Sequence, residues 1–402
     1  MVKGRRSEDV DINKMFEYNI IMMKIGIISW KEGGGTNDYI LPKPSKPWKK
    51  GLKVIQKGQF KGEIPFEKAL ISAMEYKYKD VELVYMNKFD EKKMRENDIN
   101  FLVSLNLLAA WEKSDKEYKR VYNLMEDPSI NIYPNIKEQM FLFNKGDYLE
   151  YYEKKGIPIA PTFLIKKDRN VRRIVDRVEQ KGWKSFVLKP HYAYANIGIG
   201  KFDIDELDVK GKVAKYLTKH KRFPGFVCQE VMDGFAKFWE VKSFWLNGEF
   251  KYYVAMKAAD KVFRESKIYG ESPEVFGRVK PSVLKELKKM GKKIVDNYPK
   301  NLNKHSNPPM YLRIDFGCCM GNTLDGTSYF LNEIEFAGCA IFSEESGLKD
   351  FTELWAKTYY QKAKEYKKKT KTKTKTKTKT KTKGVKRVKR TKRVQKKTRR
   401  RR

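Results

Sequence analysis

Cysteine and histidine are scarce in this 402-residue chain, which has four cysteines and three histidines. The cysteines (Cys228, Cys318, Cys319 and Cys339) form no CxxC pair, and the histidines are scattered. A structural zinc site usually needs such paired ligands, and a secreted disulfide scaffold needs a denser set of cysteines. We therefore expect neither, and a reducing compartment is the default.

Long apolar runs are also missing. No window of about 18 apolar residues occurs, so we expect no membrane span. The nearest approach, YNIIMMKIGIISW at residues 18–30, is interrupted by Lys24 and preceded by acidic residues, which disfavours a signal peptide. We interpret it as a buried first strand and expect an intracellular protein of the cytoplasm or nucleus, not a secreted one.

Acidic residues are absent from the C-terminal end. Residues 367–402 hold 22 lysines and arginines, which leaves +15 of the formal net charge of +37 for the rest of the chain. A Lys-Thr run followed by GVKRVKRTKRVQKKTRRRR repels itself and has no apolar face, so we expect disorder. Such a tail suits contact with nucleic acid or another polyanion, a nuclear-localisation signal, a membrane-surface anchor or a solvated extension. No base-reading motif decides among them.

The body of the chain alternates strand and helix patterns. Over residues 20–134 this alternation predicts a parallel sheet flanked by helices, with residues 109–125 as one amphipathic helix. From Asn135 a helix pattern runs to Gly156, and a new unit of strand, glycine loop, strand and hairpin follows. The predicted divisions are a flexible N-terminus (1–17), an α/β domain (18–134), a second domain (135–362) and a disordered tail (363–402).

Two late segments carry carboxylates in apolar surroundings: YLRIDFGCCM (311–320) and SYFLNEIE (328–335). Period-2 alternation puts Arg313 and Asp315 on one face of the first strand, and Glu333 and Glu335 on one face of the second. If the strands pair, the three carboxylates converge, which is costly unless a hard cation such as Mg²⁺ bridges them. The other interpretation is that the acids are paired with Arg313.

A second motif suggests phosphate binding. Lys189 ends the apolar strand SFVL, and Gly198 and Gly200 follow in a loop whose backbone amides can approach a polyphosphate. Taken singly the signal is weak, because many strands end in lysine. Its order relative to the acidic strands gives it weight.

That order resembles the ATP-grasp family over roughly residues 135–345. In the family an Asn/Asp-Lys step lies eleven residues before a Gly-Ile-Pro turn, as Lys145 does here before Gly156. The resemblance implies an α/β (α+β) fold, with a Rossmann-like pre-ATP-grasp domain followed by a two-lobed ATP-grasp domain. It also implies that Lys145 and Lys189 hold the α- and β-phosphates of ATP. The loop from Asn196 through Gly198 to Gly200 would cover the β- and γ-phosphates.

The rest of the resemblance assigns the remaining residues. Gln229, Glu230 and Val231 look like the adenine-binding hinge, and Glu240 like the ribose-binding acid. The family's metal motif is an Asp followed by Glu-x-Asn, which ligates one or two Mg²⁺ ions, with Mn²⁺ as a possible substitute. Here Asp315, Glu333 and Glu335 match, except that Glu335 replaces Asn.

The phosphoryl clamps are the last part of the resemblance. Arg313 and Lys257 are candidate catalytic clamps on a transferring phosphoryl group. Lys242 stands where an arginine is frequent in peptide-ligase branches.

The implied function is an ATP- and Mg²⁺-dependent carboxylate-amine ligase that works through an acylphosphate, with unknown carboxylate and amine partners. Amino-acid or peptide ligation fits this class. Two alternatives stay open. One is a small-molecule kinase on the same scaffold; the other is a catalytically silent ATP-grasp scaffold that binds nucleic acid or other polyanions through its tail.

Overall fold

The architecture is taken from a computed structural model of the full chain. It describes residues 22–29, 39–40, 47–49, 52–55, 64–166, 168–193, 198–232, 234, 239–257, 276–277, 279–303, 307–319, 328–343 and 346–368. The expected flexible N-terminus (1–17), Asn196 and the chain from residue 369 onward lie outside these residues. The predicted nuclear-localisation and polyanion-binding segment lies outside them too.

The N-terminal domain is a four-stranded parallel sheet, as the alternation predicted. Its strand order is β4 (Val81–Met86), β1 (Met23–Ile28), β5 (Ile99–Leu102) and β6 (Ile132–Tyr133), with parallel pairing throughout. The helices α1 (Phe66–Lys77) and α2 (Glu91–Glu96) connect its strands, and a small antiparallel pair, β2 (Tyr39–Ile40) and β3 (Ile64–Pro65), adjoins it. The short helix η2 (Pro47–Lys49) buries Trp48.

Two predicted helices are each split in the structure. The single helix expected at 109–125 is instead α3 (Leu107–Lys113) and α4 (Asp115–Glu126), because extended Ser114 caps α4 by accepting from the Glu117 amide. The pattern after Asn135 is likewise α5 (Ile136–Phe143) and α6 (Lys145–Glu153), separated at Asn144. The second break makes Lys145 the first residue of α6.

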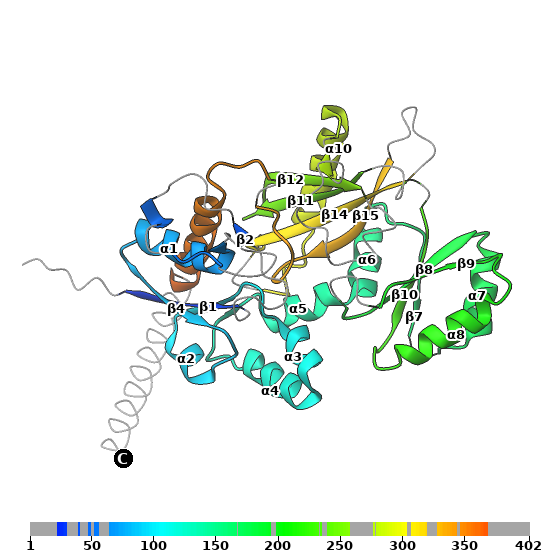
Figure 1. The fold of residues 1–402 in the computed structure, drawn as a ribbon, viewed down its shortest axis with the longest axis horizontal. Helices are drawn as coiled ribbons and strands as arrows, with labels where there is room; N and C mark the ends of the chain where they lie inside the picture. Colours follow the sequence, from blue (N-terminus) through cyan, green and yellow to red (C-terminus); the bar gives the residue numbers. More distant parts are fainter. Residues whose placement is uncertain are drawn as a thin grey trace, which may run out of the picture.

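A small lobe lies at one end of the molecule, drawn in green in Figure 1. Its antiparallel sheet has the order β7 (Thr162–Ile165), β10 (Phe226–Glu230), β8 (Ser185–Pro190) and β9 (Gly200–Asp203). The helices α7 (Val171–Gln180) and α8 (Val209–Lys219) cover it and enclose a hydrophobic core separate from the main one. The lobe touches the N-terminal domain where Arg222 stacks 3.9 Å over the Trp111 ring of α3.

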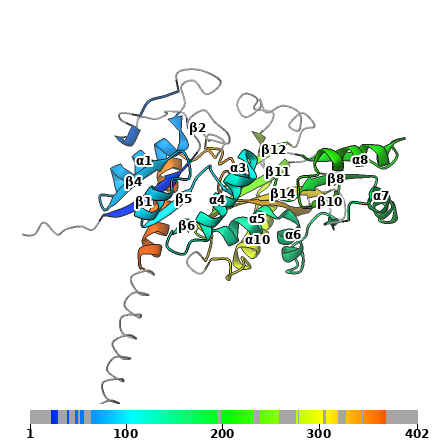
Figure 2. The same ribbon diagram turned by 90° about the horizontal axis from the view of Figure 1, so that it is seen from below.

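The large lobe lies between the small lobe and the N-terminal domain in both views (Figures 1 and 2). Its antiparallel sheet has the order β13 (Phe276–Gly277), β12 (Glu249–Lys257), β11 (Trp239–Leu246), β14 (Tyr311–Cys319) and β15 (Ser328–Glu335). The predicted hairpin turn is present, with positive φ at Asn247 and Gly248. The helix α10 (Pro281–Asp296) buries its apolar stripe and leaves its lysines exposed.

The C-terminal helix covers residues 351–368, and its buried side chains belong to the core that the large lobe shares with the N-terminal domain. Its Trp355 packs edge-on against Phe66 of α1, and its Tyr360 stacks on Tyr78. The helix corrects the predicted start of the tail at residue 363, because Ala363 and Tyr366 are buried in the core. None of the described helices is both long enough and apolar enough to cross a membrane.

A buried acid sits where the domains meet. Glu138 of α5 is 1% exposed and accepts hydrogen bonds from the Asn135 amide, the Asn303 side chain (2.6 Å) and the Tyr298 hydroxyl. Burial raises the pKa of Glu138 to about 7, although these donors oppose the shift. The folded state therefore binds a proton at Glu138 between about pH 4.5 and pH 7 that the unfolded chain releases.

The first prediction concerns this carboxyl. The folded protein binds the Glu138 proton more tightly than the unfolded chain does. The resulting contribution to the free energy of unfolding is fully present below the unfolded pKa of about 4.5, and it is lost as pH rises through 7. The variant Glu138→Gln should therefore gain stability relative to the wild type by up to about 3 kcal/mol across that interval. Denaturant unfolding of both proteins at a series of pH values measures the difference.

The comparison must be made between variants. Burial lowers the pKa of His191 to about 4, so His191 titrates over the same pH interval with the opposite sign in both proteins. Glu75→Gln, on an exposed position of α1, is the matched control and should show no such trend. A difference between Glu138→Gln and wild type that does not change with pH would contradict the assignment.

Candidate active site

The candidate site lies where β8 and β10 of the small lobe face β11, β14 and β15 of the large lobe. Lys189, near the end of β8, donates to the Gln229 side chain on β10 at 2.8 Å and to the Asn332 side chain on β15 at 3.0 Å. Burial of its ammonium, aided by the nearby charge of Lys145, lowers the pKa of Lys189 to about 7. A buried cation thus bridges the lobes through neutral partners only.

The second lysine comes from α6. Lys145 forms an ion pair with Glu333 of β15, although the two residues lie 188 positions apart in the sequence. Burial lowers the pKa of Lys145 to about 8, against the pull of Glu335 and Asp315. The two lysines that the sequence singled out are therefore both near the acidic strands.

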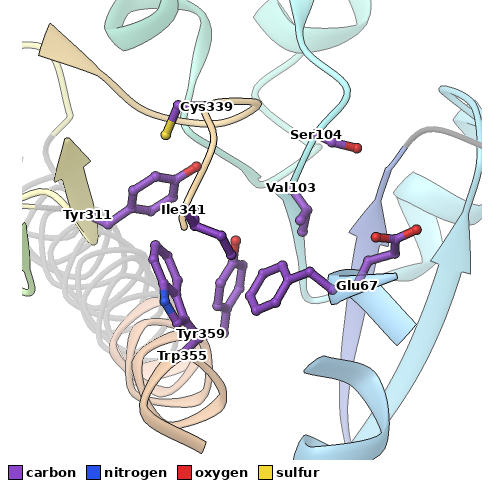
Figure 3. Close-up of a pocket in the computed structure, with 9 residues that line it drawn as sticks. Glu67, Val103, Ser104, Tyr311, Cys339, Ile341, Trp355 and Tyr359 are labelled. Atoms are coloured by element: carbon purple, nitrogen blue, oxygen red, sulfur yellow. The ribbon is translucent and has the colours of Figure 1, made fainter. Parts of the chain in front are cut away.

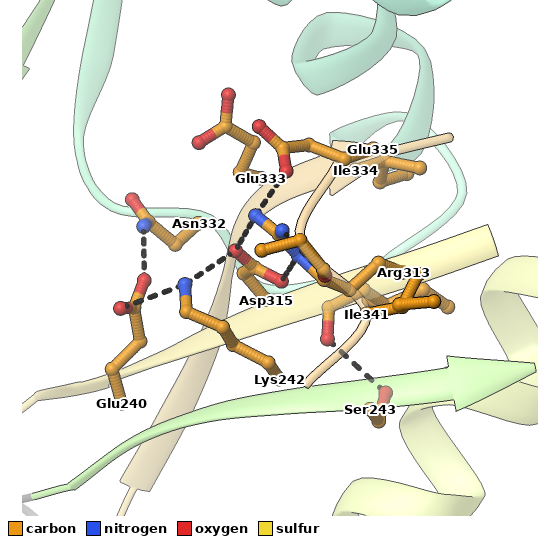
Figure 4. Close-up of polar contacts among 12 residues, drawn as sticks. Glu240, Lys242, Ser243, Arg313, Asp315, Asn332, Glu333, Ile334, Glu335 and Ile341 are labelled. Atoms are coloured by element: carbon orange, nitrogen blue, oxygen red, sulfur yellow. Dashed lines mark hydrogen bonds and ion pairs between the residues drawn. The ribbon is translucent and has the colours of Figure 1, made fainter. Parts of the chain in front are cut away.

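The acidic strands pair antiparallel, with Arg313 opposite Glu335 and Asp315 opposite Glu333. Arg313 grips Asp315 with two hydrogen bonds of 2.9 Å and forms an ion pair with Glu335, as Figure 4 shows. Asp315 is 1% exposed, and Arg313 and Lys242 outweigh its burial and lower its pKa. Of the two interpretations of these acids, the pairing with Arg313 is the one seen for Asp315 and Glu335.

Lys242 of β11 extends the network. It lies opposite Asp315 in the register, and its Nζ is 2.7 Å from Asp315 Oδ2 and 3.0 Å from Glu240 Oε2. Burial disfavours its charged form, but Asp315 and Glu240 together raise the pKa of Lys242. Glu240 also accepts from the Asn332 amide at 3.1 Å, so a continuous polar chain joins Lys189 to Arg313.

The predicted convergence of three carboxylates is therefore altered by cations that lie between them. Within the described ranges, no three histidine, cysteine or carboxylate side chains gather closely enough to hold a metal ion by themselves. The donor chemistry nevertheless fits Mg²⁺, which prefers carboxylate oxygens. Each of these three carboxylates has a positively charged partner in the structure, so the spot already holds cations.

The glycine loop is described from Gly198 onward. Gly198 has φ of +74°, and a Cβ there would approach Pro190 to 2.9 Å; its carbonyl accepts from the Tyr216 hydroxyl. A Cβ on Gly200 would meet the Tyr216 ring at 2.8 Å. The absence of a side chain at both glycines therefore lets the end of the loop pack closely against Pro190 of β8 and Tyr216 of α8.

The predicted adenine hinge continues β10. Its Glu230 amide donates to the Pro161 carbonyl and its Val231 amide to the Ser185 carbonyl, both at 2.9 to 3.0 Å. These two N–H groups are used by the fold itself. Lys257 ends β12, where its backbone pairs with Trp239, and its side chain lies outside the described atoms.

Comparison with known proteins addresses the fold. No protein-family model matches the sequence, and a search of curated proteins finds no match either. Solved structures do match. D-cycloserine synthetase DcsG has a TM-score of 0.57 at 9% identity, covering 85% of this chain and 99% of that one. D-alanine–D-alanine ligase from Bacillus anthracis with ATP has 0.53 at 14% identity, covering 86% and 99%.

A third match is the ATP-grasp ligase PsnB with its minimal precursor, with a TM-score of 0.50 at 10% identity over 84% of this chain and 99% of that chain. The chain has the ATP-grasp fold. The expected arrangement of a parallel-sheet domain followed by two lobes is thereby confirmed. At these identities the likeness carries the fold and not the chemistry of the site.

Sequence reasoning missed two residues that lie at or next to this candidate site. Asp315 pairs with Glu333 and the next residue, Phe316, pairs with Leu331, so Asn332 is the extra residue of a bulge on β15, and its side chain reaches Lys189. The signal was the polar run Asn332-Glu333, which breaks strict alternation. The other is His191, whose ring packs on Gly146 of α6 and whose buried Nε2 has no hydrogen-bond partner among the described residues.

A cavity outside the candidate site has little room. It has a volume of about 10 Å³, enough for one water, and is shown in Figure 3. Its walls come from α1, the end of β5, β14 and the C-terminal helix, and include Glu67, Ser104, Tyr311 and Cys339. In this conformation the cavity is too small for an amino-acid substrate.

The second prediction concerns the charge of Lys189. An ammonium whose pKa is about 7 is mostly neutral at pH 8, and a bound polyphosphate restores its charge. We expect ADP to bind with proton uptake at pH 8, and with less uptake at pH 6. In Lys189→Met the uptake at pH 8 should fall, and the dissociation constant at pH 6 should rise about 10- to 100-fold.

Calorimetry in two buffers of different ionisation enthalpy measures the protons taken up. The matched control is Lys184→Met, an exposed lysine just before the same strand, which should behave as wild type. Equal proton uptake in wild type and Lys189→Met would remove Lys189 from the phosphate site.

Proposed function

We propose that the protein is an ATP- and Mg²⁺-dependent ligase that joins a carboxylate to an amine through an acylphosphate. The observation that carries the proposal is the network at the lobe interface of an ATP-grasp fold. Three cations (Lys145, Lys242 and Arg313) are ion-paired there with four acids (Glu240, Asp315, Glu333 and Glu335), and Lys189 joins the network through Gln229 and Asn332. Side chains paired in this way can exchange their partners for a ligand that carries both signs of charge, such as a nucleotide with its metal ion.

The exchange follows from the contacts. Lys145 and Lys189 would leave Glu333 and Asn332 for the phosphates of ATP, which supply stronger charge-assisted hydrogen bonds. Glu333 would then be free, together with Asp315, to hold the metal. Glu240, 12% exposed at its side chain, lies beside both lobes and suits a sugar hydroxyl.

Bound Mg²⁺ would neutralise charge on the β- and γ-phosphate oxygens, and one or two ions, or Mn²⁺, fit this role. Arg313 and Lys257 would stabilise the negative charge on the phosphoryl group during its transfer.

A carboxylate oxygen of the first substrate attacks the γ-phosphorus, and ADP leaves. The amine nitrogen then attacks the acyl carbon, and phosphate departs with that oxygen while the nitrogen loses a proton. Positioning and electrostatics supply most of the catalysis, so no nucleophilic side chain is required.

The substrate class follows from the same scaffold. The matched proteins are named as a D-cycloserine synthetase, a D-alanine–D-alanine ligase and a ligase bound to a minimal precursor. We extend from these names to amino-acid or peptide ligation as the reaction of this chain. A small-molecule kinase on the same fold differs by forming a stable phosphorylated alcohol.

The third prediction tests the reaction. Full-length protein with ATP and Mg²⁺ is supplied with pooled amino acids and short peptides, and ADP release is measured. Hydroxylamine is added in parallel, because it captures an acylphosphate as a hydroxamate. We expect substrate-dependent ADP release with hydroxamate formation, and loss of both by at least about 100-fold in Glu333→Gln.

The matched control is Glu249→Gln, a largely exposed acid at the far end of the same sheet, which should keep wild-type rates. Substrate-dependent ADP release without hydroxamate, with a stable phosphorylated product, would favour the kinase. No nucleotide binding at all would leave a silent scaffold.

A further inference from the structure

Arg313 is held on three sides. Its Nε donates to Asp315 Oδ1 and its Nη2 to Asp315 Oδ2, both at 2.9 Å. The same Nη2 forms the ion pair with Glu335 Oε2, and Nη1 donates to the Ala340 carbonyl at 3.2 Å. Four of the five N–H groups of the guanidinium are thus directed at acceptors, and one N–H on Nη1 is left that no described residue accepts.

Glu335 and Glu333 differ in how they are held. Glu335 lies directly opposite Arg313 in the antiparallel register, so its partner is built into the same sheet. The partner of Glu333 is Lys145, which comes from α6 and which the proposed function sends to a phosphate. Binding of a metal nucleotide would therefore release Glu333 but leave Glu335 with its arginine.

We propose that Glu335 is a positioning residue for Arg313 and not a metal ligand. The inference rests on the proposed function. Together with Asp315 and the Ala340 carbonyl, Glu335 fixes the guanidinium plane so that the remaining Nη1 N–H points to one place. This departs from the sequence-based expectation, which counted Glu335 among the metal ligands with Asp315 and Glu333.

The charges of the site agree with this role. Arg313 is buried between two carboxylates, Asp315 and Glu335. Its side chain is 8% exposed, against 21% for Glu335 and 1% for Asp315. A guanidinium bound to one carboxylate alone can still tilt. The second carboxylate, Glu335, lies opposite Arg313 on the neighbouring strand, and together with the Ala340 carbonyl it fixes the orientation of the guanidinium.

The fourth prediction separates the two roles by metal binding. The probe is Mn²⁺ with a nonhydrolysable ATP analogue on the full chain, and the readout is the factor by which Mn²⁺ improves the affinity for the analogue. Taking this ratio cancels the direct effect of a lost charge on the nucleotide. Glu335→Gln should keep the ratio within about threefold, and Glu333→Gln should lower it at least about tenfold. Glu249→Gln is the control.

A second measurement follows Arg313 itself. Melting temperatures of Glu335→Gln, Arg313→Gln and the double variant form a cycle, recorded without ligand and with the Mn²⁺ complex. We expect Glu335→Gln to lower the melting temperature by a few degrees in the wild type, and not to lower it further when Arg313 is already replaced. The coupling should persist in the loaded protein.

The outcomes are distinct. If Glu335→Gln loses the Mn²⁺ ratio as Glu333→Gln does, or if the coupling vanishes on loading, Glu335 moves to the metal and the inference fails while the ligase proposal stands. If wild type shows no gain in affinity with Mn²⁺, the metal nucleotide site is absent and both proposals fail. Should Arg313→Gln not fold, the ratio in Glu335→Gln alone decides the question.

Discussion

The rest of the site depends on one buried interaction, the grip of Arg313 and Lys242 on Asp315. Removing two positive charges and a carboxylate from water is costly, and only close, well-directed partners offset that cost. Both cations occupy positions fixed by the sheet: Lys242 is opposite Asp315, and Arg313 is two residues before it. From this core the contacts extend outward through Glu240 and Asn332 to Lys189 in the small lobe. The position of that lobe is thus tied to the charges of the large one.

The consequence is a site whose charged side chains are largely paired with one another when no ligand is bound. In the structure, Lys145 is paired with Glu333 and Lys242 with Asp315, the two acids proposed to hold a metal, while Lys189 is held by the neutral side chains of Gln229 and Asn332. A metal nucleotide brings both kinds of charge at once, so each internal pair can be replaced without leaving a buried ion alone. Burial lowers the pKa of Lys145 and of Lys189, so the charged form of each would gain from a nearby phosphate.

Much of this was readable from the sequence, and the exceptions have physical causes. The succession of strand and helix patterns predicted the parallel sheet, and the period of two along each late strand predicted which face its acids share. That period did not predict the bulge that inserts Asn332, because the only trace of that bulge in the sequence is the break in alternation at Asn332-Glu333. The long helices were split because Ser114 and Asn144 end them locally. The convergence of Asp315, Glu333 and Glu335 was expected from their faces, but the cations between them come from β11 and α6, and long-range contacts of that kind have no signature in one strand.

The most direct test of this account is a crystal structure of the full-length protein with a nonhydrolysable ATP analogue and Mg²⁺. The account predicts that Lys145 leaves Glu333 for a phosphate oxygen, that Lys189 leaves Asn332, and that Mg²⁺ contacts Glu333. Arg313 should remain on Asp315 and Glu335. A complex in which the nucleotide lies elsewhere, with Lys145 still paired to Glu333, would contradict it.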